Sequence, residues 1–173
     1  MSNKITTPHG LKYVLSDEVL ERVMEADGDS DSIWNPLNQI VENAELFKPF
    51  CAFLAFILLA FFTDFSWYVI IAISLGIQVI ASILSNSVGI MRNPVTTIVL
   101  NVFSLLTKLF LHYAATIVVS IFVLRRWYAA VIFIVLYHIM QMLLIMLIDG
   151  YETRKAFNDR AAIVLIRKHE KQS

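Results

Sequence analysis

The sequence predicts an all-α, multi-pass membrane protein with about four transmembrane helices, arranged as two hairpins, and with cytosolic N- and C-terminal tails. Three observations predict this class. The 173-residue chain is 58% hydrophobic and only 16% charged, which exceeds the roughly half-apolar composition of soluble domains. Its apolar residues gather in long runs between residues 47 and 148, and about 20 such residues cross a bilayer as a helix. Its polar residues gather in two flanking tails.

Three regions follow from this distribution. We expect residues 1–46 to form an acidic cytosolic tail, 47–148 a four-helix membrane domain, and 149–173 a basic amphipathic tail. No segment before residue 47 has the apolar core of a signal peptide, so an internal segment is expected to direct insertion. The single cysteine, Cys51, excludes an internal disulfide.

The N-terminal tail contains apolar residues at largely helical spacing, followed by an acidic stretch over residues 27–32. This pattern predicts a short amphipathic helix and then a loop, used for surface packing or for docking a partner. The apolar positions are Leu11, Val14, Leu15, Val19, Val23 and Met24.

The first hairpin is predicted from two apolar blocks, 49–62 and 67–84, separated by residues 63–66. Its first arm has 14 residues, which give about 21 Å of helix against a hydrocarbon core of about 30 Å. That arm must therefore extend to include Phe47 and Phe65, thin the bilayer locally, or end before it has crossed the bilayer.

The second hairpin begins after a loop over residues 86–93, because Pro94 suits the first turn of a helix. The block 95–124 would give about 45 Å as one helix, which is too long for an upright crossing. With arginines at 125 and 126 marking the far interface, we expect a core span at 104–124 and a protruding or interfacial start at 95–103. The last span is 127–148.

Basic residues near the spans favour both tails in the cytosol. Two arginines on the opposite side argue against this orientation. Hairpins that dip into the bilayer without crossing it would remove the conflict, because these arginines would then lie on the cytosolic side. The inner side would hold Lys48, Arg92, Arg154, Lys155 and Arg160, against Arg125 and Arg126 outside.

The C-terminal tail reads as a basic amphipathic helix that can lie on an anionic cytosolic leaflet. The alternative is an ordinary helix packed against the protein's own loops. The residues on one side are Phe157, Ala161, Val164, Leu165 and Lys168, with Arg160, Arg167 and Lys171 nearby.

Polar residues form stripes on three of the predicted spans. At about 100° per residue, those of the third span fall within an arc of roughly 80°. Counted from residues 125 and 126, His138 lies about level with Tyr113, and Gln141 lies between His112 and Lys108. The stripes are Ser74, Gln78, Ser82 and Ser85; Thr97, Asn101, Ser104, Lys108 and His112; and Tyr137, His138 and Gln141.

These stripes predict an intramembrane polar cluster formed by Lys108, His112, His138, Gln141, Asn101 and Gln78. An ionisable residue inside a membrane is a functional hypothesis by default. Lys108 would alternatively snorkel to the interface, and the histidines would make interhelical hydrogen bonds as neutral rings or line a proton or ion path.

No motif of an enzyme, metal site or cofactor site is present, so we expect no catalysis, metal or cofactor. Phosphate loops, metalloprotease HExxH pairs and serine nucleophile elbows are missing. Two histidines without a matching carboxylate or thiolate fall short of a zinc or iron ligand set. Asp27, Asp29 and Asp31 begin like a calcium loop, but its sixth and twelfth positions are Ser32 and Asn38.

Three functions remain open. The chain is expected to be a non-catalytic accessory or scaffold subunit of a membrane protein complex, binding partners through its polar helix stripes and tails. The alternatives are a small oligomeric channel or transporter, and a hairpin protein that shapes membrane curvature. The expected partners are other membrane proteins or a second copy, together with the lipid bilayer, and not nucleic acid. Endoplasmic reticulum, plasma membrane and bacterial inner membrane are not distinguished.

Overall fold

The computed structural model describes residues 4–6, 12–26 and 30–172, and these residues are predominantly helical. Strands β1 and β2 pair antiparallel as a small hairpin that the all-α expectation omitted, with Ile5 opposite Tyr13. The elements in chain order are β1 (Lys4–Thr6), β2 (Lys12–Val14), α1 (Asp17–Glu25), α2 (Ser30–Phe62), α3 (Trp67–Leu84), α4 (Val88–Met91), α5 (Pro94–Lys108), α6 (Leu111–Phe122), α7 (Trp127–Leu147) and α8 (Tyr151–Glu170).

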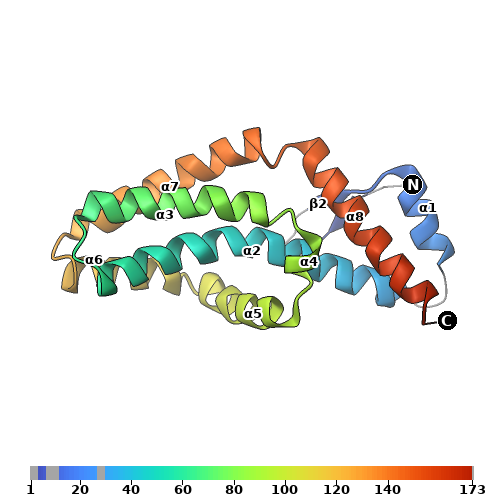
Figure 1. Ribbon diagram of the computed structural model, residues 1–173, viewed down its shortest axis with the longest axis horizontal. Helices are drawn as coiled ribbons and strands as arrows, with labels where there is room; N and C mark the ends of the chain where they lie inside the picture. Colours follow the sequence, from blue (N-terminus) through green and yellow to red (C-terminus); the bar gives the residue numbers. More distant parts are fainter. Residues whose placement is uncertain (1–3, 7–11, 27–29, 173) are drawn as a thin grey trace.

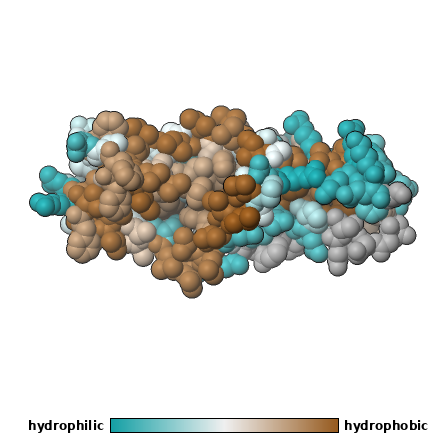
Figure 2. All heavy atoms as spheres, turned by 60° about the horizontal axis from the view of Figure 1, so that its bottom comes forward, coloured by the Kyte–Doolittle hydropathy of each residue, from teal (hydrophilic) through white to brown (hydrophobic). Residues whose placement is uncertain are grey.

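The molecule is elongated and has two distinct ends (Figure 1). One end, which we call the membrane bundle, consists of α3, α5, α6, α7 and residues 48–62 of α2. The other end, which we call the head, consists of the β-hairpin, α1, α4, α8 and residues 30–47 of α2. Figure 2 shows apolar side chains over the bundle and hydrophilic ones gathered over the head. The first and last helices lie together at the head end.

Three helices are long and apolar enough to cross a membrane, and a fourth crossing exists if α5 and α6 together count as one broken span. This agrees with the expected multi-pass membrane class. Helix α3 begins and ends where the sequence predicted, and α7 ends one residue before the expected boundary. Helix α2 pairs with α3 and α6 pairs with α7, while α3 also packs on α7 and α2 on α6.

Helix α2 differs most from expectation, because it runs for 33 residues without interruption. Pro36 and Pro49 both lie inside it, although the sequence had suggested that a span begins at Pro49. An interior proline removes one backbone hydrogen bond, and packing by neighbouring helices can offset that loss. The expected boundary at residue 46 therefore falls inside a helix that joins head and bundle.

The third apolar block is broken and not straight. Helices α5 and α6 are bent by 80° at Leu109 and Phe110, and Phe110 has a left-handed backbone with φ of 53°. The expected core span from residue 104 was wrong, since its first five residues belong to α5. The expected separate start is present but extends to Lys108. Asn93 caps α5 by accepting a hydrogen bond from the Val95 amide, with Pro94 at the first turn.

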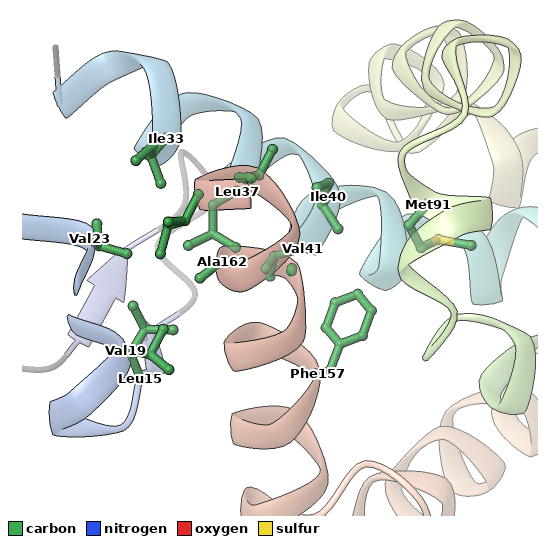
Figure 3. Close-up of a cluster of buried hydrophobic side chains, with 13 residues drawn as sticks. Leu15, Val19, Val23, Ile33, Leu37, Ile40, Val41, Met91, Phe157 and Ala162 are labelled. Carbon is green, nitrogen blue, oxygen red and sulfur yellow. The ribbon is translucent and has the colours of Figure 1, made fainter. Parts of the chain in front are cut away.

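The head has its own hydrophobic core, in which both ends of the described chain meet (Figure 3). Helix α1 confirms the short helix expected in the N-terminal tail and buries Val19 and Val23. Met24 is exposed, while Leu11 and residues 27–29 lie outside the described part of the chain. Helix α8 packs on α2, α1, α4 and β2. Its apolar face therefore covers the protein itself, as in the alternative of a helix packed against the rest of the chain, and not the membrane surface.

The bundle core is built around aromatic rings. Phe53, Phe56 and Phe133 are at most 1% exposed. Phe56 and Phe133 stack with ring centroids 4.5 Å apart, and Phe53 meets Phe133 edge-on at 5.2 Å. Rings from α2 and α7 therefore fill the space between the helices.

Candidate functional site

The six residues of the predicted polar cluster do not form one cluster. Gln78 contacts Gln141, and His112 and His138 both contact the ring of Tyr113. The other two, Asn101 and Lys108, lie exposed on the surface of α5. A second polar site, at the junction of bundle and head, was not predicted as a site.

Gln78 and Gln141 join α3 to α7. The Gln78 side chain is completely buried, and its Nε2 donates to Gln141 Oε1 at 3.1 Å and, at 3.4 Å, to the carbonyl of Tyr137. Two of the three predicted stripes thus face each other here. Such interhelical amide contacts stabilise membrane bundles by about 0.6 to 1 kcal/mol each.

His138 joins α7 to α6 through Tyr113. The Tyr113 hydroxyl and His138 Nε2 are 2.9 Å apart, which agrees with the equal depth predicted by counting residues from the connecting turn. The His138 ring is exposed on the outer surface of the bundle and not in its centre. This contact fastens the second hairpin to itself.

His112 sits at the break between α5 and α6. It is buried, its ring meets Phe53 edge-on with centroids 4.8 Å apart, and Phe103 of α5 lies 5.9 Å away. Its ring nitrogen Nδ1 is buried and has no hydrogen-bond partner among the described residues. His112 therefore holds the two halves of the broken segment against α2.

Asn101 and Lys108 are exposed on α5 and face none of the other four residues of the predicted cluster. The 80° bend ends the stripe, because residues before Leu109 and after Phe110 no longer share one helical face. Helix α6 and the turn to Arg125 rise about 21 Å, which places the backbone of Lys108 in the head-side third of a core about 30 Å thick. From there a lysine side chain can reach the interface.

The junction of bundle and head contains a buried ion pair. Lys48 Nζ on α2 bonds Asp149 Oδ2 in the turn between α7 and α8, and the two side chains are only 4% and 3% exposed. Both residues flank predicted spans on the same side of the membrane, which was the available signal for pairing them. The charge of Lys48, one of those that favoured the expected orientation, is compensated by Asp149.

Asn158 and Arg154 of α8 lie beside this pair. The Asn158 side chain is fully buried, and neither its amide nitrogen nor its amide oxygen has a protein partner; Arg154 Nε is likewise buried and unpartnered. Both residues line two cavities. One of about 20 Å³ also touches Lys48, Glu45 and Ser85. The other, of about 230 Å³, opens between the turn before α8 and β2.

Asn43 makes a further connection between head and bundle. Its buried amide donates to the Met91 carbonyl of α4 at 2.8 Å and to the Thr97 hydroxyl of α5 at 2.9 Å. One side chain of α2 thus fixes the end of α4 and the first turn of α5.

Among residues 4–6, 12–26 and 30–172, no three histidine, cysteine or acidic side chains are grouped so that they could hold a metal ion. Comparison of the chain with protein-family models, with curated proteins and with solved structures gave no match.

Proposed function

We propose that this protein is a non-catalytic accessory or scaffold subunit that holds a folded head at a fixed position on the membrane surface. The observation that carries the proposal is the continuity of α2, which belongs to the cores of both head and bundle. The expected orientation places the head in the cytosol. Its partners are other membrane proteins beside the bundle and proteins that meet the head.

One continuous helix and two sets of side-chain contacts support a rigid connection. The 33-residue α2 passes from head to bundle without a loop. The Lys48–Asp149 pair ties α2 to the start of α8, and Asn43 ties α2 to α4 and α5. A head connected in this way keeps its orientation relative to the bilayer, which suits a part that positions other proteins.

The packing of the bundle favours anchoring over conduction. Phe53, Phe56 and Phe133 fill the space between α2 and α7. Gln78 Nε2 donates to Gln141 Oε1, while Gln78 Oε1 is buried without a partner. A conducting path through one copy would need polar groups that face water.

Affinity purification of the tagged protein in mild detergent, followed by mass spectrometry and native mass determination, tests the proposal. We expect a stoichiometric foreign partner. Insertion of three glycines between Phe47 and Lys48 should reduce its recovery, because the insertion uncouples head from bundle. The matched control is the same insertion between Asp64 and Phe65, in the turn at the opposite end of the bundle.

Equal partner recovery from both insertion variants would refute the role of a fixed head. A homo-oligomer without a foreign partner would instead favour the channel alternative, and conductance in planar bilayers would be the next measurement.

A second candidate, curvature shaping, is favoured by the geometry of α5. If α6 stands upright, the 80° bend places α5 nearly in the membrane plane. A helix lying in the plane with a buried apolar face occupies one leaflet only. Tubulation of vesicles by the reconstituted protein, lost in Val102→Ser/Leu105→Ser and retained in Val118→Ser/Ile121→Ser of α6, would support this function. The exposed aliphatic residues of α5 are Val95, Ile98, Val99, Val102, Leu105 and Leu106.

A further inference from the structure

The cavity of about 230 Å³ between the α7–α8 turn and β2 lies at the depth of lipid headgroups. Ile145, in the last turns of the apolar helix α7, lines one side of it, and Tyr151, at the start of the polar helix α8, lines another. Because α7 is long and apolar enough to span the membrane, its end on the head side marks the edge of the hydrocarbon core.

Asn158 contributes two unsatisfied polar atoms to the lining of this cavity. Its side chain is 0% exposed, it lines the cavity, and both of its amide atoms lack a protein partner. Buried amide groups are nearly always hydrogen-bonded in folded proteins. A ligand that both accepts and donates hydrogen bonds would satisfy the two atoms together.

The charges around the cavity favour an anion. Arg154 and Lys155 contribute two cations, and Arg154 Nε is a buried donor without a protein partner. Asp149 also lines the cavity, but its charge is compensated by Lys48. Glu45 lines only the adjoining cavity of about 20 Å³.

The amino end of α8 adds donors of its own. Gly150 caps this 20-residue helix without a side chain, and the first amides of a helix have no partner within it. Those amides and the helix dipole favour a negatively charged group.

From these observations we propose that the cavity binds a phosphate group, with its oxygens accepting hydrogen bonds from Arg154, Lys155 and Asn158. A hydroxyl or ammonium next to the phosphate would donate to Asn158 Oδ1. Anionic phospholipid headgroups such as phosphatidylglycerol and phosphatidylserine have this chemistry, and inorganic phosphate has part of it.

Binding to the full chain in a maltoside detergent tests the site. Short-chain phosphatidylglycerol, short-chain phosphatidylcholine and inorganic phosphate are titrated separately, with bound lipid counted by native mass spectrometry and thermal unfolding followed in parallel. We expect phosphatidylglycerol to bind, and Arg154→Gln/Lys155→Gln to weaken it about tenfold or more, since phosphate loses charge-assisted hydrogen bonds. The matched control, Arg167→Gln/Lys171→Gln, removes the same charge from the other end of α8 and should bind like the natural chain.

Asn158→Leu separates binding from folding. It removes the unpartnered amide, so the unliganded variant should unfold at the same temperature or higher, while the rise in unfolding temperature on adding phosphatidylglycerol should shrink. If inorganic phosphate binds as tightly as the lipid and displaces it, the site belongs to soluble phosphate. Equal lipid binding by the natural chain, Arg154→Gln/Lys155→Gln and Asn158→Leu would overturn the proposal.

Discussion

The side chains of Lys48 and Asp149, which are 101 positions apart, form an ion pair that is almost completely buried where α2 leaves the bundle and α7 turns into α8. The pair fixes the two chain segments that connect head and membrane. Charges at this depth are costly when unpaired and tolerated when paired. Substitution of the Lys48–Asp149 pair therefore provides the most direct test of how the head and the bundle are held together.

Lys48→Met and Asp149→Leu should each destabilise the protein by about 3–5 kcal/mol, because each leaves one buried partner uncompensated. The double variant Lys48→Met/Asp149→Leu should recover most of the loss, since apolar replacements of similar volume are often neutral. Equilibrium unfolding in mixed micelles measures both effects. A double variant as unstable as the sum of the single ones would show that the two residues act independently.

Gln78→Leu and Gln141→Leu should each cost about 1 kcal/mol, and a double-mutant cycle should give a coupling of about 0.6 kcal/mol. The physical reason is the single interhelical hydrogen bond that both changes remove. Gln78→Leu paired with Met142→Leu, an exposed neighbour, should show no coupling. Equal coupling in both cycles would point to a general change in helix packing.

His138→Ala combined with Gln141→Ala tests whether these polar residues hold a complex together. We expect weaker assembly with a partner, measured as complex yield after purification in mild detergent, because both residues connect α7 to other helices. Unchanged yield would restrict their role to the bundle itself. Ile139→Ala/Met142→Ala, on the exposed side of α7, serves as the control.

Lys108 should behave as an interfacial cation. Lys108→Met is expected to change the free energy of unfolding by less than about 0.5 kcal/mol, as at other exposed sites without partners. In nanodiscs, a water-soluble amine-reactive ester should acylate Lys108 and the exposed Lys171, while the buried Lys48 stays unmodified. Protection of Lys108, read from peptide masses, would contradict snorkelling and indicate a buried, paired charge.

Phe110 should tolerate glycine better than valine. Its φ of 53° lies in the left-handed region, which costs non-glycine residues roughly 1–2 kcal/mol and β-branched ones more. The ring is 69% exposed, so its loss removes little packing. Phe110→Gly should therefore unfold near the natural temperature and Phe110→Val clearly below it. The reverse order would show that the ring itself stabilises the break.

The sequence by itself determined the membrane class, the limits of α3 and, to within one residue, those of α7. Long, predominantly apolar runs predicted α3 and α7, because a helix needs about 20 such residues to cross the hydrocarbon core. A constant rise per residue was enough to place His138 level with Tyr113. Pro94 indicated the start of α5, because proline suits the first turn of a helix.

Only the tertiary structure decided how these pieces join. A proline in the sequence favours predicting that a helix starts there. Pro49 nevertheless lies inside α2, where packing by neighbouring helices offsets the lost backbone hydrogen bond. The bend at Phe110 has no glycine or proline to announce it, and it separates Asn101 and Lys108 from His112. The Lys48–Asp149 pair and the unpartnered amide of Asn158 depend on contacts between residues far apart in sequence. Periodicity carries no information about such contacts, because it records which face of a helix is apolar and not what that face meets.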